Sequence, residues 1–365
     1  MKYPFITIIV LALVIVSCID EIKLNHDVLE PKLTVNTFIT PGEVIVVNLY
    51  QNIPLNNELS TKSVKNAKVV LYENGIEKEV LEPLIYQSYG YYNEETQTYE
   101  ADSIFKYRSN ETQAVAGNTY KITVECKGYE TVSAETTLPH VVQISGFDSI
   151  TTQKNRYGQN YSEYNYKLRF TDPANETNYY RLIVEQNYQR KSFIVLGTDT
   201  IRYINNNNLF PDYVNLYSTD PLLSNENKDA NTYVFGELEN RYNIFSDEMI
   251  NGKPYEIDFI ADLLSNSSEE LDTASGEYMK VKIKLQSLNH DMYYYLKSID
   301  AQKYSDYMMF TEPVPIYSNI ENGFGVFCGY TSSSVEITYG EYPKEGIKYY
   351  DWEDIERIFN EYREQ

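Results

Sequence analysis

The sequence is poor in the residues that most often carry chemistry, with three cysteines, three histidines and one tryptophan among 365 residues. It contains no HExxH, GxSxG or CxxC motif, and no GxGxxG or GxxxxGKS/T loop that would cradle a phosphate. Each histidine stands apart: His26 in a tether, His140 at an expected domain boundary and His290 at the start of an expected helix. We therefore expect surface or capping roles for the histidines, no metal site and no enzymatic activity.

Basic residues are also scarce, since 31 Lys and Arg stand against 53 Asp and Glu, for a formal net charge of −22. Neutralisation of phosphates by Lys and Arg supplies most of a protein's affinity for nucleic acid, so this balance argues against a nucleic-acid partner. The hydrophobic and charged fractions, 42% and 23%, are typical of a globular chain rather than a disordered one.

Tyrosine, by contrast, is abundant, with 37 residues beside 14 phenylalanines. Most tyrosines follow strand alternation and are expected to be half-buried sheet residues. Two groups fall in stretches that look like loops, where tyrosine is favoured at binding surfaces because it offers area and a hydroxyl at low entropic cost. These groups are Tyr86, Tyr89, Tyr91, Tyr92 and Tyr99 around Gly90, and Tyr157, Tyr161 and Tyr164 near Asn160.

The apolar run from Phe5 to Val16 is interrupted by Thr7 alone. A membrane-spanning helix needs about 20 apolar residues, so this run is too short to span a bilayer. With Lys2 before it, the run fits the apolar region of a secretory signal. We predict a signal peptide over residues 1–17.

The end of this run, Ile15-Val16-Ser17-Cys18, resembles a bacterial lipobox, with an aliphatic residue at −3 and a small residue at −1. The resemblance implies that Cys18 is diacylated through its thiol and becomes the mature N-terminus. Acyl chains contribute about 0.8 kcal/mol per buried CH₂, which anchors a protein to a membrane without a spanning helix. We expect this lipid and no other cofactor. The alternative is an ordinary secretory signal with an incidental cysteine.

An acidic pair, Asp20-Glu21, lies in a short tether over residues 18–31. An acidic pair just after the lipidated cysteine resembles the surface-export signal of Bacteroidota lipoproteins. This resemblance implies an outer-membrane protein that faces the cell exterior. The alternative is a generic polar tether.

After the tether, apolar and polar residues alternate with a period of two, and turn signals such as Asn74-Gly75 and Gly117-Asn118 separate the runs. Short strands at this spacing are typical of an all-β sandwich, and no long segment has the 3.6-residue period of a helix. We predict a mainly β protein. An immunoglobulin-like β-sandwich covers residues 32–139, and a larger antiparallel β domain covers residues 140–340.

Two helices are expected within this β pattern. One lies near residues 289–304, with Met292, Tyr295, Leu296 and Ile299 on one stripe and Asn289 as its N-cap. The other lies in the C-terminal tail, residues 341–365. Loops are expected at residues 205–231, 245–248 and 265–276.

The two cysteines of the body, Cys126 and Cys328, fall in different expected domains. Each lies in an apolar or aromatic strand pattern. We predict two buried free thiols rather than one long-range disulfide, despite the oxidising compartment.

Four tripeptides resemble the Asp-Ser/Thr-apolar acceptor of Bacteroidota O-glycosylation, where composition alone would give about one. Glycans at these positions would be solubilising surface groups. Strand ends can produce the same pattern, which is the alternative. The expected acceptors are Ser103, Ser149, Thr200 and Thr273.

The most distinctive stretch runs from Glu312 to Phe327 and contains Glu-Pro-Val-Pro and Gly-Phe-Gly-Val-Phe. Together with the segments 67–71, 116–120 and 136–139, it resembles an uncharacterised family of Bacteroidota lipoproteins, described only as a domain of unknown function. We expect structural roles for the signature, because its glycines permit a positive φ or a close backbone approach and its prolines stiffen the chain. The signature positions are Glu312, Pro313, Asn319, Gly323 and Gly325.

Members of that family are commonly encoded beside TonB-dependent outer-membrane receptors. The resemblance therefore implies an accessory, ligand-binding partner of such a transporter, with a peptide, a glycan or a metal chelate as ligand. One alternative is a structural or adhesive surface lipoprotein without a transport role. Another is a hydrolase whose site the sequence conceals. A concave aromatic pocket favours the first reading, and a cleft with perturbed carboxylates favours the last.

Overall fold

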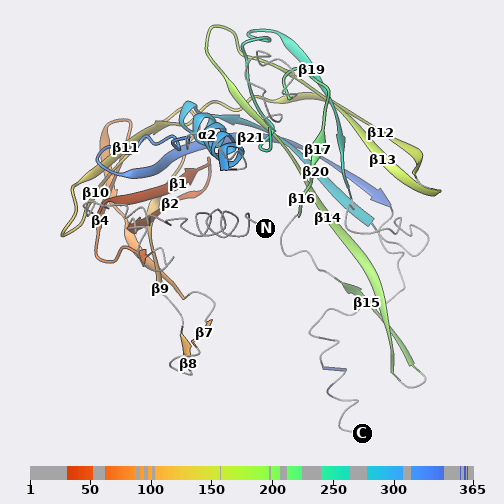
Figure 1. Ribbon diagram of the computed structural model, residues 1–365, viewed down its shortest axis with the longest axis horizontal. Coiled ribbons are helices and arrows are strands. Elements are labelled where there is room, and N and C mark those ends of the chain that lie inside the picture. The colour runs from red at the N-terminus through yellow and green to blue at the C-terminus, as the bar shows by residue number, and fades with distance from the viewer. Residues whose placement is uncertain are drawn as a thin grey trace, which may run out of the picture.

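The computed structural model describes residues 31–51, 62–87, 91–93, 98–100, 103–156, 158–196, 199–205, 212–223, 240–263, 278–306 and 314–340, and positions 354, 357, 358 and 360. These residues form a mainly β protein with two lobes that share one long sheet (Figure 1). The predicted fold class, mainly β with one packed helix, is confirmed. No helix among the described residues is long and apolar enough to cross a membrane.

The first lobe is a sandwich of two sheets. One sheet contains, in spatial order, β1 (Leu33–Ile39), β2 (Val44–Gln51), β9 (Ser103–Gln113) and β6 (Glu82–Gln87), with β3 (Lys62–Ser63) paired to β2. The facing sheet contains β11 (Val132–Thr137), β10 (Thr119–Glu125), β4 (Lys68–Glu73) and β5 (Ile76–Val80). A separate pair consists of β7 (Tyr91–Asn93) and β8 (Thr98–Glu100).

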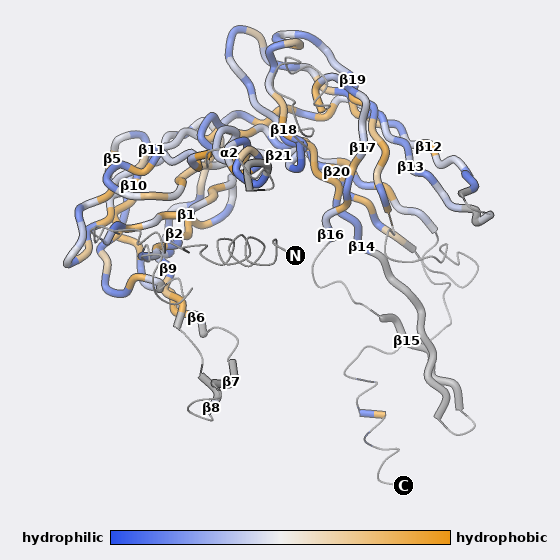
Figure 2. The backbone as a smooth tube through the Cα atoms, in the orientation of Figure 1, coloured by the Kyte–Doolittle hydropathy of each residue, from blue (hydrophilic) through white to orange (hydrophobic). Residues whose placement is uncertain are grey.

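The period-two pattern of the sequence explains this sandwich. Leu33 and Val35 on β1, and Tyr120 and Ile122 on β10, are at most 1% exposed and face a common core. The residues between them face outward, which gives the alternation of hydrophobic and hydrophilic positions along the strands in Figure 2. Burial of one face of each sheet therefore holds the sandwich together.

The second lobe is also a sandwich. Its first layer contains β15 (Asp199–Asn205), β14 (Tyr179–Leu196), β20 (Tyr278–Leu288) and β21 (Phe324–Gly340), with β16 (Asp212–Tyr213) and β18 (Ile244–Ser246) paired to β14. Its second layer contains β12 (Ile144–Arg156), β13 (Gln159–Thr171), β19 (Pro254–Ala261) and β17 (Leu216–Tyr217). The inward faces of β13, β19 and β20 supply much of its core.

One strand, β21, belongs to both sandwiches. Its first half pairs in parallel with β1, and its second half pairs antiparallel with β20. The odd-numbered residues of β21 point toward the cores. Phe327, in the first half, lies in the core of the first lobe, and Ile337, in the second half, packs against the core of the second. Ile320, just before the strand, also lies in the first core. The C-terminal region thus completes the hydrophobic core of the N-terminal sandwich.

The chain passes from the first lobe to the second at Val142, which is fixed to the shared sheet. The Val142 N–H donates to Ser287 Oγ at 3.2 Å, and the Ser333 hydroxyl donates to the Val142 carbonyl at 2.7 Å. Val142 is 5% exposed. The connection is therefore a packed, hydrogen-bonded segment rather than a loose linker.

The predicted helix near residues 289–304 is confirmed as α2 (His290–Asp306). Asn289 is its N-cap, because Asn289 Oδ1 accepts the Met292 N–H at 3.0 Å. Met292 and Leu296 bury their side chains against Val326 of β21, and Tyr293 joins them. The helix therefore covers the sheet on the face opposite to the two cores, close to the point where β21 passes from one lobe to the other (Figure 1).

Some local predictions were wrong because the strands extend further than the polar composition indicates. Residues 245–246 belong to β18, and β16 and β17 lie within the expected loop 205–231. The expected loop 265–276 lies outside the described residues. In the C-terminal tail, the described positions 354, 357, 358 and 360 are helical.

Cys126 and Cys328 are free thiols, as predicted, but the prediction that both are buried is wrong for Cys126. Cys328 is fully buried under α2, whereas Cys126 is half-buried at the edge of the first core. Burial raises the pKa of both thiols. Both therefore stay protonated and unreactive near neutral pH.

Candidate functional site

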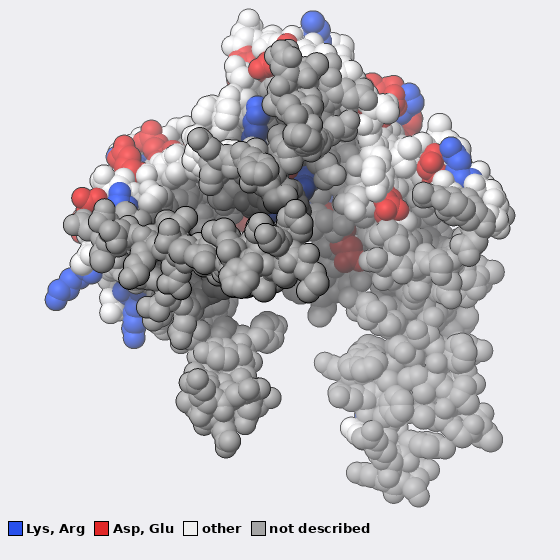
Figure 3. Space-filling model, in the orientation of Figure 1, with Lys and Arg blue, Asp and Glu red and all other residues white. Residues whose placement is uncertain are grey.

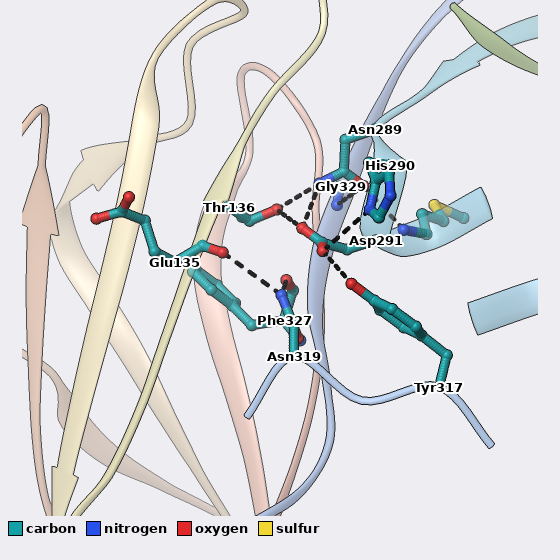
Figure 4. A network of polar contacts seen from close by, with 10 residues as sticks. Glu135, Thr136, Asn289, His290, Asp291, Tyr317, Asn319, Phe327 and Gly329 are labelled. Carbon is teal, nitrogen blue, oxygen red and sulfur yellow. Dashed lines mark hydrogen bonds and ion pairs between the residues drawn. The ribbon is translucent and has the colours of Figure 1, made fainter. Parts of the chain in front are cut away.

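The family-like signature lies where α2, β11 and β21 meet. Asn319 accepts the Phe327 N–H through Oδ1 at 2.9 Å and donates to the Phe327 carbonyl at 2.8 Å through Nδ2 (Figure 4). The same amide reaches the Glu135 carbonyl at 3.4 Å. Asn319 thus binds the backbone of β21 as a neighbouring strand would, and it fixes the segment before the strand.

The two signature glycines stand where a side chain has no space. At Gly325, which has φ +94°, an added Cβ would lie 2.0 Å from the Val35 carbonyl oxygen. At Gly323 an added Cβ would lie 2.8 Å from the Leu33 carbonyl oxygen. These glycines let β21 approach β1 closely. Glu312 and Pro313 lie outside the described residues.

A polar cluster around Asp291 joins the helix to the first sandwich (Figure 4). The Asp291 carboxylate accepts from Tyr317 at 2.7 Å, from Thr136 at 3.0 Å and from Asn289 at 3.1 Å. Asn289 also bonds to the hydroxyl of Thr136 and accepts the Gly329 N–H at 3.3 Å. Burial, together with the bond to Asp291, raises the pKa of Tyr317. Because the carboxylate is held by three donors, this cluster is a structural joint rather than a reactive site.

The second lobe carries an open groove of about 490 Å³ on the outer face of β12, β13, β19 and β17. Outward-facing residues form rows across these strands. One row contains Ile150, Asn165, Ile260 and Tyr217, which the strand register places next to one another. Ile150 and Tyr217 are 56% and 58% exposed. This row gives the groove an apolar and aromatic floor around one amide side chain.

The rows beside it carry charges. Lys167 contacts Glu256 and Asp258, each at 3.1 Å. Arg169 contacts Asp148 at 2.6 Å and Glu256 at 2.8 Å. Acidic and basic side chains accordingly lie next to one another over the right-hand lobe in Figure 3. Every charge in this ladder has a partner of opposite sign.

These contacts fix the protonation states at the rim of the groove. The hydrogen bond from Arg169 lowers the pKa of Asp148, and hydrogen bonds from Arg169 and Lys167 lower that of Glu256. Hydrogen bonds to Asp258 and Glu256 raise the pKa of Lys167. Asp148, Glu256 and Lys167 therefore stay ionised at neutral pH, so none of the three is tuned for proton transfer there. The arrangement is suited to binding a ligand with both apolar and hydrogen-bonding groups.

The structure describes part of the expected modification sites. Ser149 is half-buried on β12 and pairs in register with Tyr166. Ser103 begins β9 and Thr200 lies on β15. Cys18 and Thr273 lie outside the described residues. Among the described residues, no group of three or more His, Cys, Asp and Glu side chains could hold a metal ion.

The described members of the two tyrosine groups lie on strands where loops were expected. Tyr86 is exposed on β6, with Lys106 Nζ 5.2 Å from the centre of its ring. In the second group, Tyr161 is exposed on β13, but Tyr164 is buried and packs edge-on against Tyr339 at 4.8 Å. Tyr89 and Tyr157 lie outside the described residues. The groove uses neither group.

Comparison with protein families matches residues 19–336 to the family described as "Domain of unknown function (DUF4249)". The chain belongs to the DUF4249 family. The match spans the first sandwich, α2, the groove and most of β21, so the DUF4249 domain includes both lobes. Neither curated proteins nor solved structures give a significant match.

The groove of this DUF4249 domain was not predicted from the sequence. The sequence pattern that belongs to the groove is the alternation along β13. Asn165, Lys167 and Arg169 face outward, and the residues between and before them are buried. Such a row looks like any solvated strand face. Only the register with β19 and β17, far away in sequence, brings Ile260 and Tyr217 beside it.

Proposed function

We propose that this DUF4249 protein is an outer-membrane lipoprotein, anchored at Cys18 and exposed on the cell surface, that binds a ligand in the groove and serves a TonB-dependent transporter. The groove is the observation that carries the binding role. It combines exposed apolar and aromatic surface with ordered hydrogen-bonding groups, and its ionised groups are paired with one another.

The groove favours a binding role over a hydrolase. A general acid or base works best with a pKa near the operating pH, whereas Asp148, which lines the groove, and the neighbouring Glu256 have lowered pKa values. Tyr217 and Ile150 supply contact area that is already exposed, so a ligand gains apolar burial without first opening the protein.

The lipoprotein part of the proposal rests on the sequence before the described residues. Ser17-Cys18 after an apolar run too short to span a membrane supports lipidation, and Asp20-Glu21 supports export to the surface. The transport role rests on the family resemblance given above. A shared strand between the lobes supports a stiff body that would hold the groove in a fixed place relative to the anchor-proximal sandwich.

Native mass spectrometry of the mature lipoprotein, released from detergent after exposure to spent growth medium, tests the binding role. We expect a small-molecule adduct that the double variant Ile150→Ser, Tyr217→Ala loses. The control is Ile76→Ser, which removes an isoleucine that is 66% exposed on β5, outside the groove. The control should keep the adduct.

Each other outcome points to one of the alternatives. A protein that carries no adduct but retains whole cells on a surface would be adhesive. A protein that converts a component of the medium, with loss of conversion in the groove variant, would be an enzyme. An adduct that survives in the double variant would place the binding site elsewhere.

A further inference from the structure

A second feature lies on the opposite layer of the second lobe, on the outer face of the sheet formed by β14, β20 and β21. Arg181 of β14 stands directly across from Gln286 of β20, and Gln286 stands across from Ser332 of β21. Gln286 is 4% exposed, Arg181 is half-buried and Ser332 is exposed. The row therefore leads from a buried amide to solvent.

Arg181 is bound on one side only. Its Nε–H donates to the Tyr242 carbonyl at 3.1 Å, and the guanidinium lies 5.6 Å from the centre of the Tyr242 ring. Tyr213 and Tyr330 lie close enough to interact with it electrostatically. In the part of the chain that the structure describes, its two terminal nitrogens have no hydrogen-bond acceptor and no carboxylate partner.

An unpaired, half-buried arginine is unusual in so acidic a chain. Buried arginines are normally paired, because removing the charge from water costs free energy that a partner offsets. The nearest acid on the same face of β14 is Glu185, and it is already bound to Lys284 at 2.5 Å. Burial lowers the pKa of Arg181, yet an arginine remains charged at any physiological pH.

Gln286 supplies the complementary observation. Its Oε1 atom is buried and has no hydrogen-bond donor among the described residues. A buried acceptor without a donor is destabilising relative to a satisfied one, because it has lost its hydrogen bond to water. The two side chains that face each other across the strands thus leave one cation and one acceptor unsatisfied.

The surrounding charge selects the sign of the ligand. β20 also places Lys280, Lys282 and Lys284 on this face, against Glu185 and Glu336 from the neighbouring strands. With the guanidinium, bases outnumber acids here, although the whole chain carries −22. A carboxylate matches the planar fork of an arginine with two parallel hydrogen bonds. Gln286 Oε1 needs a donor, and a neutral hydroxyl suits this basic face better than an ammonium group.

We propose that Arg181 and Gln286 form a binding site for a small α-hydroxy acid, whose carboxylate lies against the guanidinium and whose hydroxyl donates to Gln286 Oε1. Tyr213, which is 74% exposed, and Ser332 stand at its open side. The site is separate from the groove and does not depend on the proposed function.

The test is an NMR titration of the full-length mature protein labelled with ¹⁵N at arginine side chains, with sodium glycolate, acetate and phosphate as probes at constant ionic strength. We expect a saturable shift of the Arg181 Nε–H signal with glycolate. Acetate, which lacks the hydroxyl, should bind about fivefold more weakly, which corresponds to the loss of one neutral hydrogen bond. Phosphate should bind more weakly than glycolate, because one guanidinium cannot neutralise a dianion.

The variants separate the two side chains. Arg181→Gln should abolish binding, and Gln286→Leu should make glycolate and acetate equal. Arg181→Lys keeps the positive charge but loses the two parallel N–H donors of the guanidinium, so it should weaken binding at least tenfold. This variant tests the role of Arg181 if Arg181→Gln does not fold. The control Arg108→Gln removes an exposed arginine of β9 in the first lobe and should leave the shift unchanged.

Two results would overturn the proposal. One is an Arg181 signal that does not move in a saturable way with any of the three anions. The other is wild-type binding in Arg181→Lys and Gln286→Leu, which would show that the row is filled from within the protein or by water.

Discussion

Gly325 lies beside Val35 on neighbouring parallel strands, so close that a Cβ at position 325 would stand 2.0 Å from the Val35 carbonyl oxygen. This contact is the point at which the C-terminal region of the chain joins the N-terminal sandwich. The joint explains why the segment around it is distinctive in sequence: the backbone approach leaves no room for a side chain.

The first prediction concerns this joint. Gly325→Ala should destabilise the protein by about 3 kcal/mol or more. Alanine is strained at this positive φ, and its Cβ also clashes with the Val35 carbonyl oxygen. Gly42→Ala is the matched control, since Gly42 has φ +82° but nothing within 4 Å of an added Cβ. It should cost only about 1–2 kcal/mol. Urea unfolding followed by circular dichroism measures both. Equal losses would show that β21 can move away from β1 freely.

The second prediction concerns the coupling of the two lobes. Phe327→Ala should cost about 3–5 kcal/mol, because the ring is fully buried in the first core. Since β21 also belongs to the second sandwich, amides of β10 and β13 should lose protection from hydrogen exchange together. The control Phe324→Ala removes a ring that is 48% exposed on the same strand and should cost under about 1 kcal/mol. Loss of protection in β10 alone would mean that the lobes unfold independently.

The third prediction concerns the helix cap. Asn289→Ala removes the acceptor of the Met292 and Gly329 N–H groups and one donor to Thr136, which keeps its bond to Asp291. We expect a loss of about 2–4 kcal/mol from the cap and the unsatisfied groups together. Asn289→Ser keeps a capping oxygen and should lose roughly half as much. Thermal unfolding measures the difference, and identical losses in the two variants would contradict a capping role.

The fourth prediction concerns acid stability. Glu73 accepts from Lys78, Tyr120 and Asn118 at 2.8, 2.8 and 2.9 Å. The hydrogen bond from Lys78, followed by that from Tyr120, lowers the pKa of Glu73 below its ordinary 4.5. A lowered pKa in the folded state contributes stability above pH 4.5, and this contribution disappears as the pH falls through the folded pKa.

Glu73→Gln should therefore cost about 1–3 kcal/mol at pH 7 and much less at pH 3. Denaturant unfolding at several pH values gives the two curves. Glu77→Gln on the neighbouring strand β5 is the control. It removes the same charge from an exposed position outside the Glu73 cluster. A Glu73→Gln curve parallel to that of the wild type across the acid range would rule out the linkage.

The sequence predicted the elements whose local pattern is strong. The alternation at Leu33 and Val35, the cap at Asn289 and the stripe at Met292 and Leu296 are local features, and each is confirmed. The strand β18 was missed, because Phe245-Ser246-Asp247 has the polar composition of a loop and is held by pairing with β14.

The features on which the two proposals rest depend on the register between strands that are distant in sequence. Arg181 and Gln286 are 105 positions apart in the numbering and face each other only through the pairing of β14 with β20. Tyr217 reaches the groove through β19, and Ile150 through β13. A period-two pattern shows which face of a strand is buried, but not which strand lies beside it. The fold class could therefore be predicted from the sequence, whereas the groove could not.

The measurement that tests the account most directly is co-purification of the full-length lipoprotein from outer membranes solubilised in mild detergent, with the recovered proteins quantified by mass spectrometry. Cys18→Ser, which cannot be lipidated, is the matched control and should be lost from the membrane fraction. The account predicts that the wild-type protein brings a TonB-dependent receptor with it in near-equal amount. Recovery of the lipoprotein alone, under conditions in which other receptor complexes survive, would contradict it.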